Sequence, residues 1–156
     1  MDSHERAEQV YQKFKDHLNS KGFHYDPHDE DKVITLTAHG EDLPIPLIIR
    51  VIEEREVVQM SSPLPADFPE DKRVDAAVAV ATINNKLMNG CFDLDMSDGD
   101  VRFRLCQSFH DNDFSEEQII YMMVITFKTV DEYNDPLFML AKGMMDMTQF
   151  LEKTQN

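Results

Sequence analysis

The segment spanning residues 91–106, CFDLDMSDGDVRFRLC, limits the possible folds of this chain more than any other. Apolar and polar residues alternate on both sides of Asp98-Gly99, a dipeptide that favours a two-residue type I′ turn because both central residues need positive φ. The segment therefore predicts a β-hairpin with one apolar face and one charged face. Counting outward from the turn pairs Met96 with Val101, Leu94 with Phe103, Phe92 with Leu105, Asp95 with Arg102 and Asp93 with Arg104.

The two cysteines of the chain, Cys91 and Cys106, begin and end this hairpin. The same count places them opposite each other at a hydrogen-bonded pair, where the Cα atoms lie about 5.5 Å apart and the side chains are poorly oriented for a disulfide. Neither cysteine has a neighbouring His or a CxxC partner that would activate it. We expect two free thiols and assign them no catalytic role.

The amino-terminal half predicts one helix followed by strands. Apolar residues recur at helical spacing over residues 7–18, and Gly22 supplies a stop. Residues 23–25 could form a short strand, and the acidic tract at residues 26–32 indicates a turn. From Lys32 onward, three antiparallel strands are expected, separated by the segment holding Pro44 and Pro46 and by a tight connection at Glu54-Arg55.

Three more helices are expected around the hairpin. The first begins at Pro69 and is apolar over more than half its circumference, with Asn84 inside the apolar arc, so the Asn84 amide should bond to nearby backbone. Residues 119–127, IIYMMVITF, could be a strand, but the capping-box spacing at Ser115 and Gln118 favours a helix. Pro136 should start or kink the last helix, whose apolar stripe is Leu137, Leu140, Ala141, Met144, Met147 and Leu151.

This order of elements predicts one domain over residues 1–156 of the α+β class, an antiparallel sheet flanked by helices. The charge sum is 15 Lys and Arg against 30 Asp and Glu, a net −15, which disfavours nucleic acid and anionic lipid as partners. No apolar run approaches the roughly 20 residues that a membrane helix needs, and the first ten residues are charged where a secretory signal is apolar. We therefore expect a cytoplasmic protein with no membrane or nucleic-acid partner.

Motifs for catalysis are missing from the sequence: it holds no nucleophile elbow, no Gly-rich phosphate loop and no HExxH. The acids of the hairpin do not form an EF-hand loop, because the glycine comes one place late and Arg104 stands where Glu is required. A metal site could be built from one short acidic loop that holds His24, Asp26, His28 and Asp29. The sequence thus predicts a non-enzymatic protein without a cofactor, and a small metal- or ligand-binding protein is the alternative.

Methionines concentrate in the last quarter of the chain, which holds six of the ten. Flexible thioethers can fill irregular gaps in a core, and they can also form adaptable protein-binding surfaces. Three predicted helices are apolar over more than one face, so we expect either a homodimer interface or a groove for a partner's apolar segment. The candidate interaction residues are Met122, Met123, Met139, Leu140, Met144, Met147 and Leu151.

The central segment ATINNKLMNGCFDLDMSDGDVRFRLC resembles the YbjN family of bacterial sensory transduction regulators. The matching features are Asn84 and Asn85 late in the second helix, Gly90 after it, the strand DLD, the Asp98-Gly99 turn and the returning strand VRFRL. The resemblance implies a fold like that of type III secretion chaperones, in the order α-β-β-β-α-β-β-α and often paired into dimers. It also implies Gly90 as a helix C′ residue and the Asn pair as cap or packing groups, with no catalytic residues and no cofactor.

Together these observations predict a homodimeric protein-interaction module that binds a partner polypeptide through apolar helix faces. Its role would be chaperone-like or that of a regulator in sensory signal transduction. A secretion chaperone would protect an unfolded segment, whereas a signalling regulator would bind a folded partner.

Overall fold

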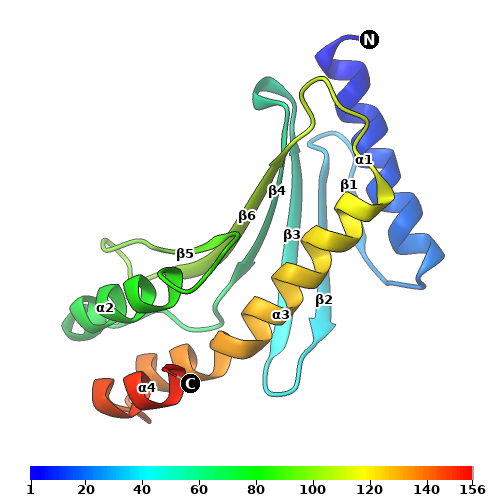
Figure 1. The fold of residues 1–156 in the computed structure, drawn as a ribbon. Coiled ribbons are helices and arrows are strands. Elements are labelled where there is room, and N and C mark those ends of the chain that lie inside the picture. Colours follow the sequence, from blue (N-terminus) through cyan, green and yellow to red (C-terminus); the bar gives the residue numbers. More distant parts are fainter. Residues whose placement is uncertain (156) are drawn as a thin grey trace.

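The computed structural model describes residues 1–155, in which six strands form one antiparallel sheet in the order β1-β2-β3-β4-β6-β5 (Figure 1). The α+β class predicted from the sequence is confirmed. The helices are α1 (Ser3–Ser20), α2 (Arg73–Asn84), α3 (Glu116–Ala141) and α4 (Met147–Thr154), with short 3-10 helices η1 (Glu53–Arg55) and η2 (Glu70–Lys72). The strands are β1 (Asp26–His28), β2 (Val33–His39), β3 (Pro44–Ile52), β4 (Val57–Pro63), β5 (Cys91–Leu94) and β6 (Val101–Ser108).

Helices α1 and α3 pack on one face of the sheet, and α3 crosses it diagonally (Figure 1). The strand residues that face these helices, such as Ile34, Ile49 and Phe103, are fully buried and form the core. Their neighbours along each strand point to the other face, as β-strands require. That other face carries half-buried residues, including Ile48 and Arg104, and it is the more polar side of the sheet.

Helices α2 and α4 lie together at one end of the sheet, where α2 packs against β5 and α4 contacts both α2 and α3 (Figure 1). The predicted role of Asn84 is confirmed here. Its side-chain amide donates to the carbonyl oxygen of Phe92 at 3.0 Å, and its Oδ1 accepts from the Phe92 backbone N–H at 2.8 Å. One amide therefore satisfies both backbone groups of a residue in the edge strand β5.

The hairpin forms, but the predicted register is wrong by two residues. Phe92 lies opposite Phe103 and Leu94 opposite Val101, and residues 95–100 form the connection instead of a two-residue turn. Asp95 causes this difference, because its carboxylate accepts from both the backbone N–H and the hydroxyl of Ser97 and so favours a longer turn. A shift of two residues keeps every side chain on its predicted face.

Two glycines near this hairpin, Gly90 and Gly99, adopt positive φ, and the predicted role of Gly90 is wrong. Helix α2 ends at Asn84 with Asn85 as its C-cap, so Gly90 is not the C′ residue. Gly90 instead adopts φ +77° just before β5, where a Cβ atom would lie 2.4 Å from the Phe103 ring. Gly99 adopts φ +79° inside the connection, and a Cβ there would lie 2.0 Å from the carbonyl oxygen of Phe68.

Helix α3 includes the ambiguous run at residues 119–127, as the capping box at Ser115 and Gln118 indicated. Pro136 neither starts a helix nor ends one, because α3 continues through it to Ala141. The predicted last helix is therefore wrong, and its stripe is divided among α3, the connection at residues 142–146, which holds Met144, and α4. The break comes later, at Gly143, whose φ of +72° and bonded N–H form a Schellman motif with the preceding turn.

The acidic tract after α1 also differs from its prediction. Residues 23–25 are not a strand, whereas residues 26–28 form β1 and only residues 29–32 form the turn. Pro27 is tolerated in β1 because this strand lies at the edge of the sheet. Pro44 and Pro46 lie inside β3 instead of separating two strands.

Candidate protein-binding surface

The predicted methionine surface is only partly a surface. Met122, Met123 and Leu140 are buried in the core, because they lie on the sides of α3 that face the sheet and α4. Met139, Met147 and Leu151 are half-buried, and Met144 is 65% exposed. The structure therefore leaves four of the seven candidates with accessible side chains.

Helix α3 presents a different set of apolar residues to solvent. Ile120, Tyr121 and Val124 are 41%, 45% and 42% exposed, and positions 120, 121 and 124 lie on one face of the helix. We call these three residues the α3 stripe. These residues were not predicted from the sequence, although the sequence contains a signal for them: a run that is apolar all round cannot bury every face against a single sheet.

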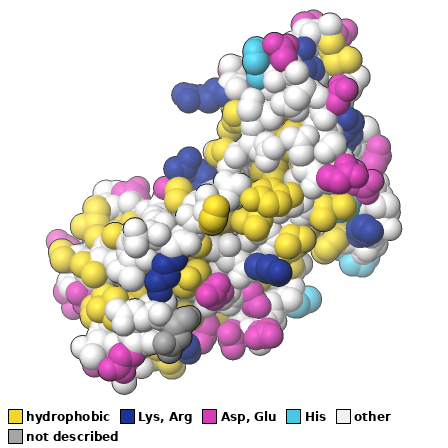
Figure 2. Space-filling view, viewed as in Figure 1, with side chains coloured by type: hydrophobic (Ala, Val, Ile, Leu, Met, Phe, Trp, Pro, Cys, Tyr) yellow, Lys and Arg dark blue, Asp and Glu magenta, His cyan; other side chains and the backbone are white. Residues whose placement is uncertain are grey.

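Hydrophobic side chains gather over α3 in the middle of the face seen in Figure 2. The amide of Asn89 donates to the hydroxyl of Tyr121 at 3.0 Å, which ties the segment between α2 and β5 to the stripe. Met88, which precedes Asn89, is fully exposed. Glu116 and Glu117 lie at the amino-terminal end of the stripe and are exposed.

A second apolar region lies at the end of the molecule formed by α2 and α4, seen at the lower left of Figure 2. Val74 and Val78, one turn apart on α2, are exposed. A Cβ on Gly143 would lie 2.6 Å from the amine of Lys72, so the segment that carries Met144 lies next to the start of α2. We call Val74, Val78 and Met144 the α2–α4 surface.

The acidic histidine loop does not converge on a metal site. Within residues 1–155, no group of three or more His, Cys, Asp or Glu side chains is placed to hold a metal ion. Asp29 is instead bound by the Tyr11 hydroxyl at 2.8 Å and the Lys15 amine at 3.2 Å, and these two hydrogen bonds lower its pKa. Its carboxylate thus fixes the turn after β1 against α1, while His24 and His28 are exposed.

The two cysteines are free, as predicted, but they are not opposite each other. Cys91 lies opposite Arg104, whose guanidinium pairs with Asp93 at 2.6 Å. Burial, followed by the charge of Asp93, raises the pKa of the Cys91 thiol. A raised pKa reduces the thiolate fraction, which is the reactive form.

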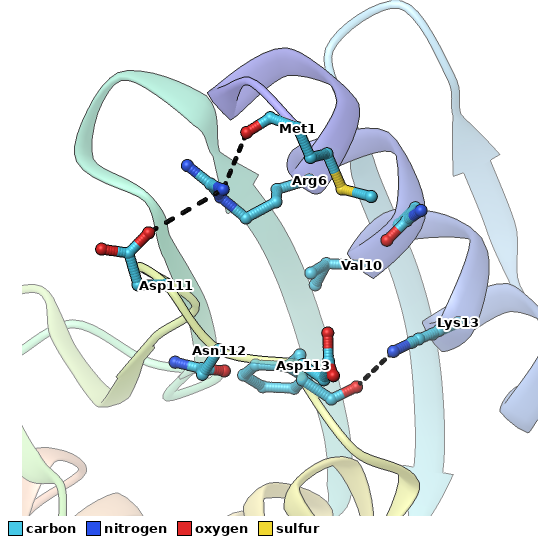
Figure 3. Close-up of a pocket in the computed structure, with 9 residues that line it drawn as sticks. Met1, Arg6, Val10, Lys13, Asp111, Asn112 and Asp113 are labelled. Atoms are coloured by element: carbon cyan, nitrogen blue, oxygen red, sulfur yellow. Dashed lines mark hydrogen bonds and ion pairs between the residues drawn. The ribbon is translucent and has the colours of Figure 1, made fainter.

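A cavity of about 210 Å³ lies between the start of α1 and residues 111–114 (Figure 3). Its two basic side chains are already engaged. Arg6 donates to the Met1 carbonyl at 2.9 Å and to Glu56 at 3.0 Å, and Lys13 donates to the Phe114 carbonyl at 3.0 Å. The Lys13 bond, together with the ion pair of Arg6 and Asp111 at 4.0 Å, holds α1 against the segment before α3.

The central segment at residues 81–106 carries the Asn84 contact, the left-handed Gly90 and the hairpin. The family model of YbjN, described as "Putative bacterial sensory transduction regulator", matches residues 12–139. The chain belongs to the YbjN family. This match spans the sheet and α2, most of α3 and half of α1.

A solved structure agrees with this membership. The chain is similar to the crystal structure of YbjN from E. coli, described there as "a putative transcription regulator", with a TM-score of 0.62 and 15% sequence identity. The similarity covers 83% of this chain and 90% of the E. coli chain, which shows a shared YbjN fold. No curated protein matches the sequence. Within its described part, this YbjN-family chain has no helix long and apolar enough to cross a bilayer.

Proposed function

We propose that this YbjN-family protein is a non-enzymatic, cytoplasmic regulator in sensory signal transduction that acts by binding a partner protein. The observation that carries the proposal is the α3 stripe: three large apolar side chains, each more than two-fifths exposed, lie together on the face of α3 that does not contact the sheet. Contiguous apolar patches of this kind mark interaction sites more often than apolar residues exposed singly.

The partner segment that fits this stripe is a basic amphipathic helix. A helix places its apolar side chains at three- and four-residue intervals, which matches the spacing of the stripe. The chain has a net charge of −15, and Glu116 and Glu117 are exposed beside the stripe, so basic residues flanking the partner's apolar face would be attracted. A chaperone-like role would use the same contact to shield such a segment.

For the contact of a homodimer we propose the α2–α4 surface. Val74, Val78 and Met144 are large, apolar and exposed at one end of the molecule, well separated along the chain from the α3 stripe. A Val74→Asp substitution should convert a dimer into a monomer with unchanged helical content. The molar mass measured by light scattering tests this, and a monomeric wild-type protein would contradict it.

The partner contact can be tested with a synthetic amphipathic peptide of leucine and lysine and the full chain. The Ile120→Asp and Val124→Asp variants should weaken peptide binding about tenfold or more, since burial of one such side chain contributes about 1.5–3 kcal/mol. Met96→Asp is the matched control, because Met96 is half-exposed in the hairpin connection and gives the same change in charge. Isothermal titration calorimetry should show this weaker binding in the α3 variants and unchanged binding in the control.

A second peptide, with glutamate in place of lysine, distinguishes a requirement for positive charge from nonspecific hydrophobic binding. It should bind much more weakly than the lysine peptide. Equal losses in Ile120→Asp and Met96→Asp, or equal binding of the two peptides, would remove the α3 stripe as the partner contact.

A further inference from the structure

The outer edge of β2 lacks a strand partner over half its length. β1 pairs only with residues 33–35 of β2, whereas β3 pairs with all of residues 33–39 (Figure 1). Successive residues of a strand direct their backbone N–H and C=O groups to alternate sides, so residues 36–39 turn some of these groups away from β3. Within the described chain, no other backbone group bonds to them. Such an edge is a template for an added strand.

Concave surfaces flank this edge on both faces of the sheet. On the helix side, a cavity of about 560 Å³ is lined by Phe23, Ala38, Ile45 and Phe127 and is predominantly apolar. On the other side, a groove of about 690 Å³ runs along Thr37 and neighbouring residues. The segment at residues 22–25, which leaves α1 and diverges from β2, forms the outer wall of both. A strand added at residues 36–39 would therefore direct alternate side chains into two preformed recesses.

Basic side chains outnumber acidic ones around the helix-side cavity, although the chain as a whole is acidic. His24, His39 and Lys128 line the cavity and are exposed. Its one acid, Asp131, already accepts the backbone N–H of Glu41 at 2.9 Å. Lys128 has no carboxylate within 4.0 Å among the described residues. The amine of Lys128 is therefore available to pair with an acidic side chain of a ligand, beside the apolar wall of the cavity.

We propose that residues 36–39 of β2 bind an extended segment of a partner protein as a seventh strand. An apolar side chain of that segment fills the cavity beside Phe23 and Phe127, and an acidic side chain two positions away along the same face meets Lys128. Backbone hydrogen bonds supply affinity, and the two recesses select the sequence. The strand edge belongs to β2 and the α3 stripe to α3, although Lys128 follows Val124 by one helical turn, so hydrogen exchange at residues 36–39 and at α3 distinguishes the two contacts.

The molecule contains its own control for this proposal. β5 pairs only with residues 101–104, so residues 105–108 of β6 also have one strand partner. A peptide that bound any free strand edge would protect both stretches. A peptide selected by the recesses beside β2 would protect residues 36–39 alone.

The test uses hydrogen exchange on the full chain with a capped peptide of alternating valine and threonine that carries glutamate at one valine position. At a peptide concentration of about ten times Kd, exchange at the free amides of residues 36–39 should slow about tenfold, while residues 105–108 should be unchanged. A peptide N-methylated on the residues that face β2 should not bind. Lys128→Glu should reverse the preference to a peptide with lysine at the glutamate position, whereas Lys142→Glu, an exposed lysine outside the cavity, should not.

Five results would overturn the proposal, and the first four concern the peptide. They are absence of binding, binding that survives N-methylation, equal protection of residues 105–108, and protection confined to α3. Protection of residues 36–39 that rises with protein concentration in the absence of peptide, together with a dimeric mass, would assign this edge to a second copy of the chain and would also overturn it.

Discussion

At both edges of the sheet, a short strand leaves four residues of its longer neighbour with a single strand partner, yet the two short strands are held differently. In β5, Phe92 is buried and stacks edge-on with Phe103 and Tyr133, and Asn84 of α2 binds both of its backbone groups. In β1, all three residues are exposed. An edge strand is thus held in place either by core packing and a helix, as in β5, or mainly by backbone pairing with the neighbouring strand, as in β1.

The difference separates what each edge can do. The strand β5 contributes an aromatic ring to the core, so disturbing it should lower the stability of the whole molecule. β1 contributes no buried side chain, and its turn is held to α1 through Asp29 at the surface. Disturbing β1 should therefore change local opening more than global stability, which suits an edge that accepts an added strand.

The largest effect should come from Asn84→Ala. The substitution leaves the N–H and C=O of Phe92 without their partner, and two shielded backbone groups left unpaired cost about 2–4 kcal/mol. Asn85→Ala is the matched control, since Asn85 is exposed and its side chain has no such contact, and it should change the free energy of unfolding by less than about 0.5 kcal/mol. Urea unfolding measures both; equal losses would show that the Asn84 contact does not hold β5.

The next largest effect should come from alanine substitutions at the two glycines that precede the edge strands. Gly22 and Gly90 both have positive φ, so alanine at either position should cost about 1 kcal/mol from the backbone alone. At Gly90 the new Cβ also meets the Phe103 ring, which should add about 1–2 kcal/mol, whereas Gly22 has nothing within 4 Å. Thermal or urea unfolding should therefore show the larger loss for Gly90→Ala. A larger loss for Gly22→Ala would reverse the comparison.

Much of the β5 edge could be predicted from the sequence. Alternation gave the faces of the hairpin correctly, and an amide inside an apolar arc indicated a bond to backbone. The register could not be predicted, because it depends on whether Asp95 bonds to Ser97 or continues the strand, and both states suit the same alternation. The β1 edge was harder still, since three exposed residues carry no burial pattern.

The interaction surface could be predicted even less well. Residues 119–127 are apolar on all sides, so the sequence did not show which face of the helix would meet the sheet. Docking of α3 buries Met122 and Met123 and leaves Ile120 and Val124 exposed, and that choice depends on packing against strands far away in the chain. The length of β2 that stays unpaired likewise depends on where residues 22–25 diverge from β2.

The smallest effect is a response to pH that should have opposite signs at the two edges. Beyond residues 105–108, β6 leads to His110, and a hydrogen bond with Glu56, aided by the charge of Asp111, raises the pKa of His110 above its ordinary 6.5. Because the folded state binds this proton more tightly, the contribution of His110 to the free energy of unfolding is complete below about pH 6.5 and is lost as the pH rises through the raised pKa.

At the other edge, hydrogen bonds from Tyr11 and Lys15 hold the pKa of Asp29 below 3.8. The contribution of Asp29 to the free energy of unfolding is therefore present above about pH 4 and is lost on acidification. The stability difference between wild type and His110→Gln should therefore shrink on raising the pH from 6 to 8, and that for Asp29→Asn should shrink on acidification below about pH 4. Both groups are exposed, so each change should be small, and a His110→Gln difference that grew with pH would contradict the assignment of Glu56 as its partner.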